Sequence, residues 1–172
     1  MATATMPWVD ARPFRAHLHH LMATGDLSAA EVATLAGVSP RLTDALLHGR
    51  AGRALRRVSP ASARALLTVT AYQARTLRSR QVPAEEPRGW LHRLLEDGAA
   101  LEELAATLEV DASVLAGLAD GSRTWCNGLL AVRLVTALRA FSARAASALP
   151  ERTDQQQEEP EEVAPAEGRV AA

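Results

Sequence analysis

Apolar residues in the first half of the chain recur every three or four positions in short segments, a pattern typical of amphipathic helices. This spacing predicts helices at residues 12–24, 29–36 and 39–48 and a fourth helix from Pro60 onward. Period-two alternation of β-branched and aromatic residues is absent from the sequence, so the predicted fold class is all-α. The residues expected to face the core are Phe14, Leu18, Leu21, Met22, Val32, Ala33, Leu35, Leu66, Leu67 and Val69.

Polar residues and glycines mark where these helices begin and end. Ser28 and Glu31 have the spacing of a capping box, in which each side chain accepts a hydrogen bond from the other residue's backbone amide. Gly37 supplies a left-handed turn after the second helix, and Ser39 caps the third. Two short helices joined by a glycine-containing turn are typical of a helix-turn-helix unit.

The second half of the chain repeats the pattern of the first. HLHHLMATG at 17–25 is similar to WLHRLLEDG at 90–98, and VATLAGVS at 32–39 is similar to LAATLEVD at 104–111. LLHG at 46–49 has its counterpart in LADG at 118–121. The offset is 73 residues before the first turn and 72 after it. These matches in the same order favour an internal duplication over a chance likeness of short helices.

The duplication divides the chain into four parts. We predict a helix-turn-helix domain at 10–78, a linker at 79–87, a degenerate helix-turn-helix-like domain at 88–149 and a disordered acidic tail at 150–172. The linker is inferred from the prolines and glutamates of SRQVPAEEP, and the tail from its Pro, Gln and Glu content.

The second domain ends in a long predicted helix from Gly128 to Leu149. Its apolar stripe either seals the domain's own core or forms a homodimer seam through 128–149, since many helix-turn-helix proteins dimerise to span two half-sites. The stripe consists of Leu130, Leu134, Leu138 and Phe141.

The segment EVATLAGVSPRLTDALLHG at 31–49 resembles the helix-turn-helix of lambda-repressor-like and lactose-repressor-like regulators, especially actinobacterial and actinobacteriophage proteins with an AGVS turn. The resemblance covers roughly residues 14–70. It implies that Ala33 lies where the helices touch and that Ser39 caps the recognition helix, residues 39–48. One position departs from the pattern, because an aliphatic residue is expected where Thr43 stands. Either the helix is rotated slightly or Leu42 is the buried anchor.

The resemblance also implies which residues read the bases. Arg41 has the fork to bond a guanine edge, and Asp44 can accept from cytosine. The loop GRAGRALRRVSP at 49–60 suits phosphates, since its glycines allow close approach and its guanidinium groups carry charge. The alternative is a solvated basic loop. Expected base contacts are Pro40, Arg41, Asp44 and Ala45, and expected phosphate contacts are Ser39, Arg50, Arg53, Arg56 and Arg57.

The charge distribution supports a division of roles, although the formal net charge is only −1. Nine arginines and one acid lie between Arg41 and Arg80, whereas residues 151–172 carry seven acids and two arginines. All 19 basic residues are arginine. A flexible acidic tail is therefore expected either to compete with DNA for the basic region or only to aid solubility.

The second unit keeps the helical pattern and loses the cations. Its expected recognition helix, ASVLAGLAD at 112–120, has no basic residue, and Glu102, Glu103 and Glu109 precede it. Phosphates would repel such a helix, so we interpret this unit as a packing or self-association module. Trp125 is expected in the core.

The sequence gives little support to catalysis, metal binding or membrane insertion. His17 and His20 share a helix face, but further ligands at matching spacing are lacking. Cys126 has no histidine nearby, and no Gly-Lys-Ser/Thr follows the glycines at 49–52. We therefore expect no enzyme, no cofactor and no metal. No apolar stretch approaches the roughly 20 residues that cross a bilayer, and a cytoplasmic, nucleoid-associated location is expected.

Two functional hypotheses remain at this stage. The first is a sequence-specific transcriptional regulator, such as a repressor, that binds double-stranded DNA through the first unit. The second is an adaptor whose helix-turn-helix-like modules bind proteins.

Overall fold

The computed structural model describes residues 8–148, with side chains as far as Ser147, and it is mostly helical, as predicted. The predicted tail at 150–172 lies outside the described residues. The first unit contains β1 (Val9–Asp10), α1 (Arg12–Gly25), α2 (Ala29–Ala36), α3 (Pro40–His48), β2 (Arg57–Val58), α4 (Pro60–Thr68) and α5 (Ala71–Thr76). The second unit contains β3 (Gln81–Pro83), α6 (Glu85–Glu96), α7 (Leu101–Thr107), α8 (Ala112–Ala119), β4 (Trp125–Asn127) and α9 (Gly128–Ala148).

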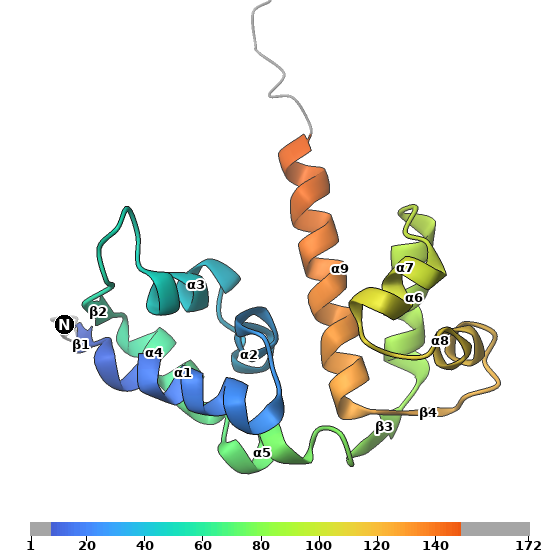
Figure 1. The fold of residues 1–172 in the computed structure, drawn as a ribbon, viewed down its shortest axis with the longest axis horizontal. Coiled ribbons are helices and arrows are strands. Elements are labelled where there is room, and N and C mark those ends of the chain that lie inside the picture. Colours follow the sequence, from blue (N-terminus) through green and yellow to red (C-terminus); the bar gives the residue numbers. More distant parts are fainter. Residues whose placement is uncertain (1–7, 149–172) are drawn as a thin grey trace, which may run out of the picture.

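Both units have the same topology, in which a short strand precedes three helices and pairs with a second strand that leads into a further helix (Figure 1). β1 pairs with β2 in antiparallel fashion, with Val9 opposite Val58. β3 pairs with β4 in the same way, with Val82 opposite Cys126. Repeated topology thus accompanies the repeated sequence.

Equivalent arginines hold equivalent parts of the two units together. Arg15 of α1 donates from Nε to the Leu46 carbonyl at 2.5 Å and from Nη2 to the Leu55 carbonyl at 3.1 Å. Arg88 of α6 donates from Nε to the Leu118 carbonyl at 2.9 Å and from Nη2 to the Arg123 carbonyl at 3.1 Å. Carbonyls at the end of a helix lack intrahelical partners, so each guanidinium satisfies one and ties down the loop that follows.

The predicted helix caps are confirmed. Ser28 Oγ accepts from the Glu31 amide at 3.2 Å, and a Glu31 carboxylate oxygen accepts from the Ser28 amide at 2.6 Å. Ser39 Oγ accepts from the Leu42 amide, and Gly37 has φ +65°. In the second unit Asp111 accepts from the Ser113 amide, and this hydrogen bond lowers the pKa of the Asp111 carboxyl.

Three predictions made from the sequence differ from the structure. The expected linker at 79–87 is mostly ordered structure, because β3 and the first turn of α6 occupy most of it. Leu67, expected to face the core, lies on the outer side of α4 and is 58% exposed. The first helix, predicted to end at residue 24, includes Gly25, and the left-handed residue that follows it is Asp26. A Cβ on Gly25 would lie 3.0 Å from the Ala74 Cβ, so glycine allows α1 and α5 to pack closely.

Two hydrophobic cores lie on either side of α9, which packs against α2 of the first unit and α6 of the second. Leu129 belongs to the first core, whereas Leu130 and Leu134 are buried in the second. Leu138 and Phe141 are half-buried against that second core. The stripe therefore seals the chain's own cores, and Leu130 and Leu134 are not available for the homodimer seam considered through 128–149.

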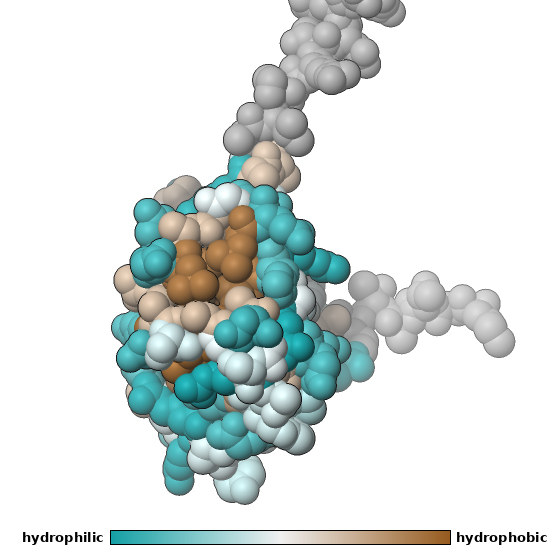
Figure 2. Space-filling model, turned by 90° about the vertical axis from the view of Figure 1, so that its right-hand side faces the viewer, coloured by the Kyte–Doolittle hydropathy of each residue, from teal (hydrophilic) through white to brown (hydrophobic). Residues whose placement is uncertain are grey.

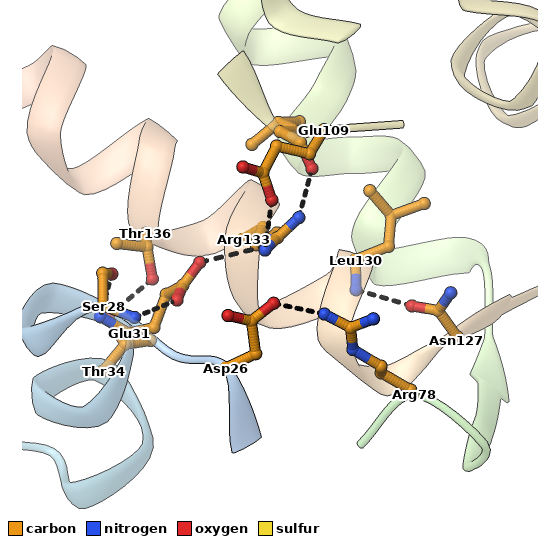
Figure 3. Close-up of polar contacts among 11 residues, drawn as sticks. Asp26, Ser28, Glu31, Thr34, Arg78, Glu109, Asn127, Leu130, Arg133 and Thr136 are labelled. Carbon is orange, nitrogen blue, oxygen red and sulfur yellow. Dashed lines mark hydrogen bonds and ion pairs between the residues drawn. The ribbon is translucent and has the colours of Figure 1, made fainter. Parts of the chain in front are cut away.

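Arg133 of α9 joins the two units at a partly buried polar contact (Figure 3). Its Nε lies 3.3 Å from Glu31 Oε1, and its Nη2 lies 3.0 Å from Glu109 Oε2. Its Nη1 donates to the Leu108 carbonyl at 2.6 Å. The Arg133 and Glu31 side chains are only 12% and 11% exposed. An ion pair between Asp26 and Arg78 lies nearby.

We expect Glu31→Gln to lower the free energy of unfolding by about 2–3 kcal/mol, because it leaves Arg133 with one carboxylate fewer at a buried site. Glutamine still accepts from the Ser28 amide, so the capping box survives. Thermal unfolding followed by circular dichroism should show a Tm lower by about 5–10 °C. The exposed Glu103, which occupies the matching position of α7, provides the control, and Glu103→Gln should change the Tm little. Equal melting of the two variants would contradict the assignment.

Candidate nucleic-acid interface

The exposed face of α3 carries the polar residues that the sequence placed near DNA. Pro40, Arg41 and Asp44 are exposed, as is His48 at the end of the helix. The spacing of 41, 44 and 48 puts these three side chains on one face. His48 Nε2 lies 3.8 Å from Asp44 Oδ1. His48 was not among the predicted site residues.

Ala45 was predicted to contact bases, but its side chain is 2% exposed and it lies on the inner side of α3. It is therefore removed from the candidate set. Thr43 itself occupies the buried position where an aliphatic residue was expected, with 1% exposure. Its hydroxyl donates to the Pro40 carbonyl at 2.9 Å, which satisfies the hydroxyl inside the core. Leu42 is half-buried beside the same core.

The segment after α3 folds back on itself and projects past that helix (Figure 1). We call residues 49–57 the arginine hairpin. Arg50 and Arg53 exchange backbone hydrogen bonds of 2.8 and 2.9 Å. The intervening Ala51 and Gly52 have φ +48° and +73°, as in the tight two-residue turns of β-hairpins. The predicted loop is therefore a defined hairpin.

The base of the arginine hairpin is held by the first helix and the first strand. Arg15 bonds the Leu55 carbonyl, and the Ala11 amide donates to the Arg56 carbonyl at 2.9 Å. β1 then pairs with β2 where the hairpin ends. These contacts position the hairpin beside α3 without using its exposed guanidinium groups.

The exposed arginines of α3 and the hairpin differ from several neighbouring arginines, because their side chains have no partner among the residues that the structure describes. Arg12, by contrast, donates to Asp10, and these hydrogen bonds lower the pKa of the Asp10 carboxyl. Arg15, Arg78 and Arg133 are also bonded. Within the described part of the chain, no hydrogen bond or ion pair engages the guanidinium groups of Arg41, Arg50, Arg53, Arg56 and Arg57. Their charge is available to an anionic partner.

Trp8 is a candidate site residue that the sequence did not indicate. It is 62% exposed and precedes β1, which brings it to the arginine hairpin. Cavities of about 610 and 550 Å³ flank the hairpin, and Trp8, Leu55 and Arg57 line both. Because β1 and β2 are far apart in the sequence, no local pattern predicts this placement. An indole beside guanidinium groups adds a hydrogen-bond donor and an apolar surface to the basic region.

The second unit has the same scaffold but lacks the hairpin. The connection from the cap of α8 to the cap of α9, Asp111 to Asn127, is four residues shorter than that from Ser39 to Ser59. Trp125, expected in the core, is 57% exposed. Figure 2 views the molecule from the side of α6–α8 and shows an apolar patch bordered by hydrophilic residues. This face differs in character from the basic surface of the first unit.

The remaining candidate chemistry has structural explanations. His17 Nε2 lies 3.0 Å from the Val69 carbonyl. Burial raises the pKa of the Cys126 thiol, which makes the thiolate less available. Among residues 8–148 no group of three or more His, Cys, Asp or Glu side chains is arranged to hold a metal ion. Within the same residues, every helix is too short or too polar to cross a membrane.

Comparison with family models, curated proteins and solved structures gave no match to this chain.

Gly49→Ala should disrupt the arginine hairpin. Gly49 has φ +80°, and a Cβ there would lie 2.3 Å from the Arg53 carbonyl oxygen. We expect the free energy that stabilises the folded hairpin to fall by about 1–3 kcal/mol. Hydrogen exchange at the Arg50 and Arg53 amides should become faster. Gly52→Ala is the control, because it also places alanine at positive φ but meets no atom within 4 Å. Similar exchange rates in both variants would show that the close contact does not restrain the hairpin.

Proposed function

We propose that the chain is a sequence-specific regulator that binds double-stranded DNA through its first unit. The observation that carries the proposal is the set of arginines on α3 and the arginine hairpin that have no partner among residues 8–148, beside a helix-turn-helix. Guanidinium groups bind phosphates through paired hydrogen bonds, and phosphate contacts dominate affinity for DNA. Association with the nucleoid in the cytoplasm follows from this role.

In the proposed complex α3 enters the major groove with its exposed face toward the bases. Arg41 reads guanine, Asp44 accepts from cytosine, and Pro40 makes apolar contact. Ser39 keeps its hydroxyl proton for a phosphate, since its oxygen already accepts from the Leu42 amide. Arg50, Arg53, Arg56 and Arg57 bind phosphates. Ala45 has no role at the bases.

The second unit serves in this proposal as a support for the first. Its α8 carries no cation, and α9 links it to α2, the first helix of the helix-turn-helix. The alternative function is an adaptor in which both units bind proteins. The exposed Trp125 and the apolar patch of Figure 2 favour protein contact for the second unit alone.

Arg41→Ala should relax base preference and leave nonspecific binding mostly intact. Base contacts determine which DNA sequence is preferred, whereas phosphate contacts supply affinity for any sequence. We expect the free energy of binding to the preferred DNA site to weaken by about 1–3 kcal/mol. Selection of bound DNA from a random pool, performed on both proteins, measures the preference. Arg75→Ala changes an exposed arginine of α5 and should leave the selected sequence unchanged. An unchanged preference in the Arg41 variant would remove Arg41 from base reading.

Changing Arg53, Arg56 and Arg57 together to alanine should weaken binding to all sequences. Each lost phosphate contact should flatten the slope of log affinity against log salt by about 0.9. Fluorescence anisotropy with mixed-sequence DNA at several salt concentrations provides the slope.

A matched triple variant tests whether position or total charge matters. Arg75, Arg80 and Arg93 are exposed and lie outside the arginine hairpin, so their replacement removes the same charge elsewhere. This variant should keep the slope of the unmodified chain. Equal slopes in both triple variants would show that the hairpin arginines are solvated and do not contact phosphates. If the unmodified chain binds no DNA at low salt, that result would favour the adaptor function.

A further inference from the structure

An apolar groove of about 610 Å³ lies between α3, α4 and the arginine hairpin. We call it the α3–α4 groove. Its volume falls within the range of small-molecule sites, which are mostly apolar with a few polar groups that orient the ligand. Its apolar lining includes Val38, Leu42, Leu55, Val58, Ala61 and Ala65.

The arginine hairpin contributes positively charged side chains to the lining of the α3–α4 groove. Arg50 and Arg57 line it, and neither guanidinium has a hydrogen-bond or ion-pair partner among residues 8–148. Asp44, the one acid between Arg41 and Arg80, is not among the lining residues. Trp8 lines the same groove with its largely exposed indole. The groove thus combines an apolar body with two uncompensated cations.

We propose that the α3–α4 groove binds a small apolar carboxylate, with its hydrocarbon in the groove and its carboxylate on Arg50 and Arg57. Bidentate hydrogen bonds from guanidinium to carboxylate fix the orientation, and burial of the hydrocarbon supplies affinity. A neutral molecule of the same shape leaves the two cations unpaired. A cationic one is repelled by them.

The position of the groove gives this ligand a consequence for DNA binding, and that part of the inference rests on the proposed function. Arg50 and Arg57 are two of the proposed phosphate contacts. A carboxylate bound there occupies both guanidinium groups and neutralises one positive charge beside the recognition helix. The ligand therefore antagonises DNA binding, as an effector of a repressor does. The ligand site itself requires no DNA.

Decanoate and its neutral counterpart decanol are the probes. A chain with Trp90→Phe and Trp125→Phe keeps Trp8 as its single tryptophan, so Trp8 fluorescence reports binding in the groove. Decanoate should bind saturably and at least tenfold more tightly than decanol. Calorimetry on the unmodified chain repeats the comparison independently of the tryptophan substitutions. Decanol binding as tightly as decanoate would overturn the carboxylate site.

Two further variants locate the site. The double change Arg50→Gln and Arg57→Gln should weaken decanoate at least fivefold and leave decanol unchanged. Ala65→Phe fills the groove from α4 and should remove binding of both probes, whereas Ala116→Phe on the exposed face of α8 should change neither. Circular dichroism verifies that each variant is folded. Decanoate affinity unchanged by Ala65→Phe would place the ligand elsewhere and overturn the proposal.

The DNA arm separates this inference from the proposed function. In the unmodified chain, decanoate should weaken DNA binding several-fold, and in Ala65→Phe it should have no effect. Decanoate binding with the expected variant pattern in a chain that binds no DNA supports the site and overturns only the proposed function. DNA affinity unaffected by bound decanoate overturns the antagonism.

Discussion

The arrangement of the two units depends on the side chain of Arg133. Its guanidinium reaches Glu31 in the first unit and Glu109 and the Leu108 carbonyl in the second. A buried charge is costly unless it is paired, and here two carboxylates pair the guanidinium while Glu109 and the Leu108 carbonyl accept hydrogen bonds from it. This contact therefore restricts the relative position of the two units, because a shift of either unit would separate Arg133 from one of its carboxylate partners. Apolar packing of α9 buries surface against both units, and Arg133 defines how the two units are positioned relative to each other.

Glu31 connects this contact to the helix-turn-helix. The same carboxylate that meets Arg133 also caps α2 by accepting from the Ser28 amide. The start of α2 is thus fixed both within its unit and to α9, and Thr34 adds a hydroxyl contact of 2.9 Å to Thr136. Because α2 packs against α3, a constraint on α2 also restrains the orientation of α3. The second unit thus contacts the first through α2, and any restraint on α3 from this side acts through α2.

Sequence reasoning succeeded where the signal was local. The capping box of Ser28 and Glu31 and the turn at Gly37 are encoded by residues only a few positions apart. It failed where distant segments decide. Ala45 is buried and lines the same cavity as residues of α4 and the hairpin, which are not its neighbours in the sequence. Trp8 reaches the site only through pairing of β1 with β2, and Trp125 lies exposed on β4.

The two units share a scaffold and differ in what is attached to it. Arg15 and Arg88 make the same pair of carbonyl bonds, so the core geometry tolerates two different connections after the third helix. One unit lengthens that connection into the arginine hairpin and follows it with the short α4. The other shortens the connection and follows it with α9, which is 21 residues long against 9 for α4. Loop insertions on a fixed scaffold change binding chemistry with little effect on the core. A long helix, by contrast, spans both cores. Each unit has extended an element that the other keeps short, and the basic surface lies on the unit whose α2 contacts Arg133 through Glu31.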